Sequence, residues 1–203
     1  MKLELVYEDA DLFAVNKPAG LLSVPGKGAE KFASAQSYCQ EVCVGAMAVH
    51  RLDMATSGLL LIAKHKEAER YYKGLFEQRR VAKVYHALVE GEIQPARGLM
   101  DYPLIVDWER RPRQKVCYET GKAALTHYEL LGYENGRSRL ALYPHTGRSH
   151  QLRVHLATRG HPIIGDEFYN ETHPGSRLLL HAHQLDLPRR DGQQLRLVCP
   201  TPF

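Results

Sequence analysis

The chain contains His50-Arg51-Leu52-Asp53-Met54-Ala55-Thr56-Ser57-Gly58, and this segment runs directly into the apolar Leu59-Leu60-Leu61-Ile62-Ala63. The apolar run predicts a buried strand. Because a buried strand is rigid, it could hold the carboxylate of Asp53, on the turn before it, in a fixed orientation. Taken alone, the residues favour an ordinary interpretation, in which Asp53 caps the turn and Arg51 is a solvated charge.

Hydrophobic periodicity predicts the elements on either side of this segment. Apolar or alternating runs predict strands at 3–7, 12–16, 81–90, 125–133, 137–143, 178–187 and 195–198. Spacing of three and four residues predicts helices over 32–42 and 64–80. Asn135-Gly136 predicts a hairpin turn between two of the strands. Residues 92–122, rich in Pro, Gly and Arg, are expected to be irregular.

A third helix is expected over 147–158, with Thr146 as its N-cap and Gly160 and Pro162 beyond its end. On such a helix Arg148 and Arg153 would lie on opposite faces, so the two arginines should not do the same job. The first turn could bind an anion. The segment is also compatible with a plain basic amphipathic helix, and the spacing of its histidines argues against a metal site.

The order of these elements indicates the fold class. Hairpins are frequent and strand–helix–strand units are few, which is typical of an α+β domain on a mainly antiparallel, mixed β-sheet flanked by helices and loops. The sequence shows no repeat, no low-complexity tail and no linker. We therefore expect a single domain over residues 1–203.

Composition narrows the class of protein. The chain has 203 residues, 44% of them hydrophobic, so it can build a core, and it has a net charge of only +4. No stretch approaches the roughly 18 apolar residues of a membrane span, and the N-terminus does not resemble a signal peptide. We expect a cytoplasmic protein with no membrane partner. The four cysteines form no zinc pattern and are expected to be reduced thiols that fill apolar space.

The basic residues cluster along the chain, which is a pattern of proteins that bind nucleic acid but also of ordinary solvated surfaces. The first group comprises Lys64, Lys66, Arg70, Lys73, Arg79, Arg80 and Lys83. A second group comprises Arg110, Arg111, Arg113 and Lys115, and a third Arg148, Arg153 and Arg159. Composition alone does not distinguish the two interpretations.

Several blocks together resemble the RluA-type pseudouridine synthases. Residues 50–58 are similar to that family's H-R-L-D-x-x-T-S-G signature. In the same order, residues 16–22 resemble its N-K-P-x-G-L block, 83–85 its K-x-Y block and 146–155 its T-G-R-x-H-Q-[IL]-R-x-H block. Residues 161–166 and 179–182 also match. His145 is one departure, since an apolar residue is expected before Thr-Gly-Arg.

The resemblance implies an RNA pseudouridine synthase fold and an isomerase that needs no cofactor or metal. Segments 20–26 and 114–122 are similar to a short member that modifies stem-loop uridines in 23S rRNA and in the tRNA anticodon loop. The protein is therefore expected to be a monomer whose partner is one of these RNAs or both. The N-K-P block begins so early, at Asn16, that no N-terminal S4-type RNA-binding domain is expected.

The resemblance also implies roles for individual residues. Asp53 would act on the sugar or remove a proton, Arg153 would be its cationic partner, and Tyr85 would stack on the flipped uracil. The remaining residues expected to contact RNA or substrate are Arg51, His50, Arg148, His150 and Leu180.

Two other functions fit less well. A glycoside hydrolase would need a second catalytic carboxylate and an aromatic sugar cleft, whereas the motif holds one acid and the chain one tryptophan, Trp108. An RNA-binding module that has lost catalysis would have no need for Asp53, Tyr85 and Arg153 together.

Overall fold

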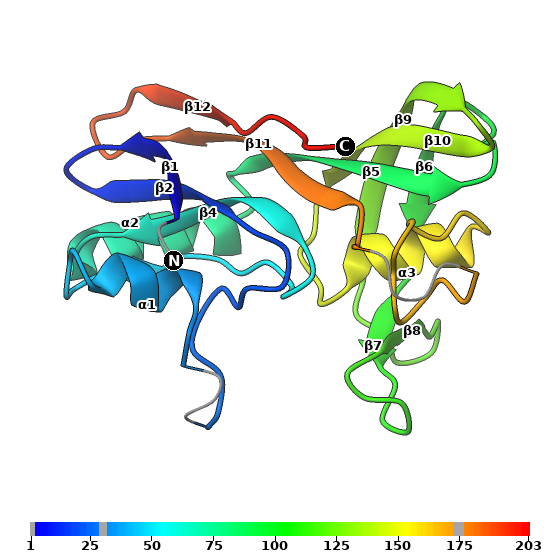
Figure 1. The fold of residues 1–203 in the computed structure, drawn as a ribbon, viewed down its shortest axis with the longest axis horizontal. Helices are drawn as coiled ribbons and strands as arrows, with labels where there is room; N and C mark the ends of the chain where they lie inside the picture. Colours follow the sequence, from blue (N-terminus) through cyan, green and yellow to red (C-terminus); the bar gives the residue numbers. More distant parts are fainter. Residues whose placement is uncertain (1–2, 29–31, 173–176) are drawn as a thin grey trace. The chain divides into compact units, whose positions relative to one another are not determined.

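The computed structural model describes residues 3–28, 32–172 and 177–203. The chain forms two compact units, the first of Met1–Lys83 and His181–Pro202, the second of Val84–Leu180 with Phe203. Figure 1 shows the elements of both units in chain colours. The expected α+β class is confirmed, because among the described residues the strand pairs within each unit are antiparallel except β4 with β11.

The first unit is built on a mixed sheet. Its strands are β1 (Glu4–Glu8), β2 (Leu12–Lys17), β3 (Met47–Ala48), β4 (Ser57–Ala63), β11 (Leu180–Pro188, all but its first residue) and β12 (Gln194–Val198). β4 lies between β2 and β11, and β3 and β12 pair with β4 and β11. Every residue of β4 is buried. A strand covered on both faces needs no polar alternation, which accounts for its continuous apolar run.

Two helices cover one side of this sheet, beneath β1 and β2 in Figure 1. They are α1 (Ala35–Gln40), which packs on β2 and β3, and α2 (Lys66–Glu77), which packs on β3 and β4. Ser34 and Ser37 form a capping box at the start of α1. Both helices are shorter than the periodicity predicts, because hydrogen-bonded caps end them inside the periodic segment.

The second unit has an antiparallel sheet with the order β5, β10, β9, β6. These strands are β5 (Ala82–Glu90, all but its first two residues), β6 (Arg97–Asp101), β9 (Leu125–Glu134) and β10 (Arg137–Pro144). The turn between β9 and β10 has positive φ at both Asn135 (52°) and Gly136 (74°), as a two-residue hairpin turn requires. The hairpin expected from Asn-Gly is confirmed.

The expectation that 92–122 would be irregular is wrong. This segment contains β6 and a separate two-stranded sheet of β7 (Leu104–Val106) and β8 (Gln114–Val116). Leu104 and Val116 contact Ala124 and Val154 in the core of the unit. The strands are too short, and too interrupted by Pro and Gly, for a periodic signal, so tertiary packing decides them.

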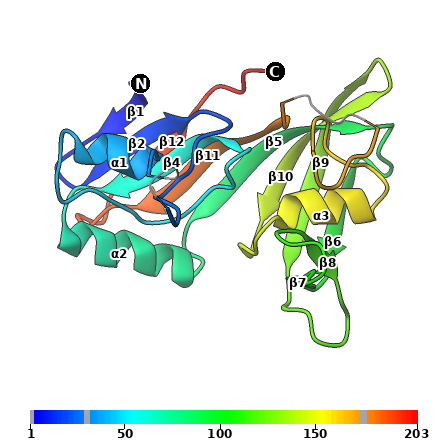
Figure 2. The same ribbon diagram turned by 60° about the horizontal axis from the view of Figure 1, so that its bottom comes forward.

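The expected start of the third helix is also wrong. The helix α3 is Gln151–Thr158, its N-cap is His150 with φ 53°, and no side chain caps it. The Thr146 hydroxyl instead accepts the Leu125 N–H (2.9 Å) and donates to Gln151 Oε1 (2.7 Å). Figure 2 shows the short α3 in front of its sheet. Arg148 therefore lies in the loop before α3, and the expectation that Arg148 and Arg153 occupy opposite faces of one helix is wrong.

Candidate active site

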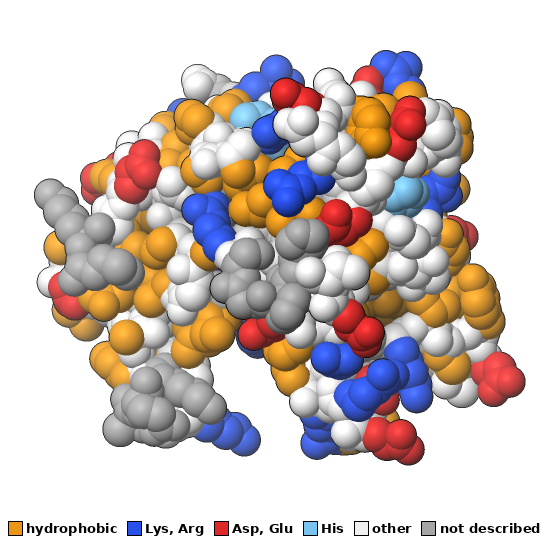
Figure 3. Space-filling view, turned by 45° about the vertical axis from the view of Figure 1, so that its right-hand side comes forward, with side chains coloured by type: hydrophobic (Ala, Val, Ile, Leu, Met, Phe, Trp, Pro, Cys, Tyr) orange, Lys and Arg blue, Asp and Glu red, His pale blue; other side chains and the backbone are white. Residues whose placement is uncertain are grey.

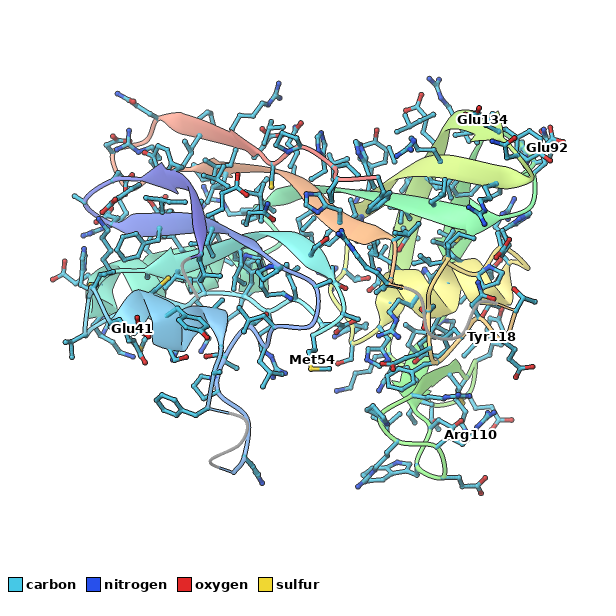
Figure 4. All side chains as sticks on the ribbon, in the orientation of Figure 1. Glu41, Met54, Glu92, Arg110, Tyr118 and Glu134 are labelled. Carbon is cyan, nitrogen blue, oxygen red and sulfur yellow. The ribbon has the colours of Figure 1, made fainter. Side chains whose placement is uncertain are left out.

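Asp53 lies in the loop that enters β4, and hydrogen bonds from a second loop hold that segment. The Ser23 hydroxyl donates to Leu52 O (2.8 Å) and accepts the Leu52 N–H (2.9 Å). On the other side, Met54 O accepts the Gly20 N–H (2.8 Å). Both neighbours of Asp53 are thus fixed to residues 20–23, and its carboxyl group is carried by a rigid backbone. Met54, labelled in Figure 4, is itself half exposed.

Lys17 is a buried cation whose ammonium group bonds to the backbone of this loop. Its side chain is fully buried, and Nζ donates to Pro18 O (2.9 Å), Leu21 O (2.8 Å) and Met54 O (3.1 Å). Burial lowers the pKa of Lys17 to about 8, and the negative charge of Asp53 opposes that shift. Lys17 is not among the site residues expected from the sequence, although it lies in the N-K-P block that resembles the family's.

His50 and Arg51 differ in their surroundings. The ring of His50 stacks on Phe76 (centroids 4.3 Å apart), and its Nε2 accepts the Leu61 N–H (3.0 Å). Burial, with a smaller effect of Lys83, lowers the pKa of His50 to about 3, so the ring is neutral. Arg51 is exposed. His50 thus binds the motif to β4. That His50 and Arg51 contact RNA remains a prediction.

The Thr-Ser-Gly end of the motif joins β4 to β11. The Ser57 hydroxyl and His181 Nδ1 are 2.9 Å apart, and Gly58 pairs with Ala182. A Cβ on Gly58, whose φ is 109°, would lie 2.4 Å from Ala182 O. The signature therefore requires glycine at position 58, because the backbones of β4 and β11 meet there. His181, the partner of the Ser57 hydroxyl, lies within the matched block 179–182.

Tyr85 and Leu180 both belong to the second unit, and Leu180 is the first residue of β11. Tyr85 is half-buried on β5, opposite Leu142 of β10. Leu180 is buried, and the residue before it is anchored on both sides: Leu179 O accepts the Leu88 N–H (3.1 Å), and Leu179 N donates to Ile164 O (2.9 Å). Sheet backbone thus places both residues.

Arg153 is the most buried of the expected site residues, with 2% of its side chain exposed. Its Nε and Nη2 donate to the two oxygens of Asp166, at 2.8 and 2.7 Å. The rings of Phe168 and Tyr169 lie 5.0 and 5.3 Å from the guanidinium. Asp166 is not among the site residues expected from the sequence, although it is the last residue of the matched block 161–166.

Arg148 and His150 lie in the loop before α3. Arg148 Nε donates to Ala123 O (3.1 Å), and His150 Nδ1 is 2.7 Å from the hydroxyl of Tyr169. Tyr169 therefore contacts both residues: its hydroxyl bonds to His150, and its ring lies against the guanidinium of Arg153. Asp53, Arg51 and His50 belong to the first unit, and the other five expected site residues to the second.

The described residues contain no group of three or more His, Cys, Asp or Glu side chains that could hold a metal ion. No helix in the described part of the chain is long and apolar enough to cross a membrane.

Comparison with known proteins identifies the family. The sequence pattern of the RNA pseudouridylate synthases matches residues 11–158. The chain belongs to the RNA pseudouridylate synthase family. It is an isomerase that converts uridine in RNA to pseudouridine, and RNA is its substrate. The expected family and fold are confirmed.

Individual members of the RNA pseudouridylate synthase family support this. The chain is 47% identical to the dual-specificity RNA pseudouridine synthase RluA of Yersinia pestis, covering 98% of this chain and 99% of that one. It is 50% identical to the Escherichia coli K12 protein of the same name, covering 99% and 94%. Human RNA pseudouridylate synthase domain containing 1 has a similar structure, with a TM-score of 0.84, 31% identity, and coverage of 100% and 84%.

Proposed function

We propose that this enzyme modifies stem-loop uridines in two RNAs, 23S rRNA and the anticodon loop of tRNA. The observation that carries the proposal is the near-full-length identity of about half the residues to relatives named as dual-specificity enzymes. The segments 20–26 and 114–122 support it, since both resemble the short dual-specificity member. The alternative is a family member that acts on a single rRNA or tRNA site.

The proposed reaction breaks the N1–C1′ bond of the target uridine, rotates the base and forms a C5–C1′ bond. C5 then loses its proton and N1 takes up a proton, so the product is an isomer of the substrate. We assign Asp53 to the sugar or the proton, since a carboxylate can attack an electron-poor sugar carbon or take a proton. The loop that Lys17, Gly20 and Ser23 hold supports this assignment, because it restricts where the carboxylate can move.

The remaining roles are part of the same proposal. Arg153 is the cationic partner of the catalytic carboxylate, and Tyr85 is the stacking surface for the flipped uracil. Extruding a base from its stack costs a few kcal/mol, and stacking on an aromatic ring returns about 1–3 kcal/mol per base. Arg51, His50, Arg148, His150 and Leu180 contact the RNA or close the uracil pocket.

We propose that both units act as one catalytic domain. The family match runs from residue 11 to residue 158 and so includes most of both units. We further propose a monomer that works in the cytoplasm, where its RNA substrates are and where the four cysteines, all free, stay reduced. Light scattering of the purified protein measures the oligomeric state.

Tritium release from RNA labelled at C5 of uridine tests the activity, with a 23S rRNA stem-loop and a tRNA anticodon stem-loop as separate substrates. We expect the wild type to release tritium from both and Asp53→Asn from neither. Asp191→Asn, which changes an exposed carboxylate of the same unit, is the matched control and should stay active.

Release from only one RNA contradicts dual specificity and leaves the isomerase activity intact. Full activity of Asp53→Asn would contradict the proposed mechanism. A protein that binds both RNAs and releases no tritium would be an RNA-binding module without catalysis.

A further inference from the structure

Arg153 and Asp166 form an ion pair that is removed from solvent. The exposed fractions of their side chains are 2% and 0%, and both carboxylate oxygens of Asp166 accept a guanidinium N–H. A buried ion pair adds little net stability compared with apolar residues of similar size, because both charges lose their hydration. Stability alone therefore does not account for this pair.

Backbone N–H groups also hold the Asp166 carboxylate that binds the arginine. Its Oδ1 also accepts the N–H groups of Phe168 (2.9 Å) and Tyr169 (3.1 Å), and its own backbone O accepts the Asn170 N–H (3.0 Å). Asp166 thus begins the turn that runs to Asn170. The backbone N–H groups of this turn hold the carboxylate in addition to the arginine.

The same turn also limits the tilt of the guanidinium. The rings of Phe168 and Tyr169 approach it, and the Tyr169 hydroxyl is held by the Gln114 N–H (2.8 Å) and by His150 Nδ1 (2.7 Å). Asp166 binds the edge formed by Nε and one terminal nitrogen. The guanidinium plane and the direction of its opposite edge are therefore determined.

We propose that Asp166 is a positioning residue for catalysis, which orients the Arg153 guanidinium toward the group it serves in the reaction. The proposal rests on the role given to Arg153 under the proposed function. Misplacing a catalytic group by about 1 Å can reduce a rate by about 100-fold. Asp166 bonds to Arg153 and to backbone N–H groups, and the residues assigned to RNA contact are not among these partners, so the effect should fall on kcat more than on KM.

Asp166→Asn tests this, because asparagine keeps the volume and removes the charge and one acceptor. In the tritium-release assay we expect kcat to fall roughly 10- to 100-fold with KM changed less than about threefold. Asp186→Asn is the matched control, since Asp186 also accepts an arginine Nε (2.6 Å, from Arg196), at the surface. It should leave both constants unchanged. Unchanged kcat in folded Asp166→Asn would overturn the proposal.

A double-mutant cycle separates positioning from a purely structural effect. If Asp166 acts through Arg153, Arg153→Lys with Asp166→Asn will be no slower than Arg153→Lys alone. If the losses of kcat in the two single variants multiply in the double variant, the proposal is overturned. In the wild type, the side-chain Nε–H signal of Arg153 in a ¹⁵N NMR spectrum should be sharp and protected from exchange, and Asp166→Asn should broaden it.

Two further results distinguish the possible failures. If Asp166→Asn does not fold, Asp166→Glu keeps the charge and takes its place in the cycle. If the wild type releases tritium and Arg153→Lys is as fast, the positioning proposal fails while the isomerase activity stands. If the wild type releases none from either RNA, the proposed function fails and the NMR signal alone reports whether Asp166 orders Arg153.

Discussion

Gly58 shows how a single residue of the signature serves the backbone and not the chemistry. Its φ is 109°, and any side chain there would bring its Cβ within 2.4 Å of Ala182 O, so another residue would require movement of β4 or β11. We expect Gly58→Ala to lower the free energy of unfolding by on the order of 2–4 kcal/mol, measured by urea denaturation.

Gly132 provides the control for this change. A Cβ there meets nothing within 4 Å. Gly132→Ala should therefore change the free energy of unfolding by less than about 1 kcal/mol. Equal losses in the two variants would show that the close approach of β11 does not matter.

His50 predicts a pH dependence of stability. The pKa of His50 is lowered from 6.5 to about 3 in the folded protein, by burial first and by Lys83 second. Below pH 6.5 the unfolded chain therefore binds a proton that the folded chain does not, and stability falls as the pH drops toward 3. The contribution is full above pH 6.5.

His50→Gln removes this titration and keeps an acceptor that could meet the Leu61 N–H. Between pH 6.5 and pH 5 we expect the wild type to lose on the order of 1 kcal/mol more than His50→Gln, by urea denaturation at each pH. Parallel pH profiles of the two proteins would mean that the folded ring titrates normally.

At the scale of elements, the start of α3 depends on a contact with a strand. Thr146 is 6% exposed and joins Leu125, the first residue of β9, to Gln151, the first residue of α3. Thr146→Val leaves the Leu125 N–H and the Gln151 amide without this partner. We expect it to lower the free energy of unfolding by about 1–3 kcal/mol.

Thr158→Val, at the exposed end of the same helix, is the matched control and should change the free energy of unfolding by less than about 0.5 kcal/mol. If both variants are equally stable in urea, the hydroxyl does not hold the helix to the strand.

At the scale of the whole molecule, the net charge of +4 is modest, so the distribution of the charged residues decides how the protein binds RNA. Arg110, labelled with Tyr118 in Figure 4, lies on the segment that joins β7 to β8, and 66% of its side chain is exposed. Figure 3 shows blue side chains gathered at this end of the second unit, with acidic ones among them. Asp107 is buried and holds Arg110 (2.8 Å).

Removing two charges from this segment should weaken RNA binding in a salt-dependent way. Each phosphate contact contributes about 0.7–0.9 to the slope of log K against log salt. We expect Arg111→Gln with Arg113→Gln to lower that slope by up to about 1.8, measured by fluorescence anisotropy with an anticodon stem-loop.

Arg97→Gln with Arg196→Gln removes the same charge from surface arginines that pair with Glu129 and Asp186. This control should leave the slope unchanged. Equal slopes in both double variants would place the RNA elsewhere on the molecule.

Much of the first unit could be predicted from periodicity. The run from Leu59 to Ala63 is the central strand, and the helix predicted over 64–80 appears as α2. The strands β7 and β8 could not be predicted, because three residues show no period and their pairing is decided by core contacts of Leu104 and Val116. The start of α3 was misplaced because the Thr146 hydroxyl binds a distant strand instead of capping the helix.

The sequence by itself determined the family and the reaction, and it predicted the site residues, since the ordered blocks around Asp53, Tyr85 and Arg153 carry the resemblance without coordinates. Only the tertiary structure decided what supports these residues. The bonds of Lys17 and Ser23 to the Asp53 loop, and of Asp166 to Arg153, join residues that lie 37, 29 and 13 positions apart in the chain. The physical reason is that a buried charge or polar group must find its partner in space, and spacing along the sequence does not specify that partner.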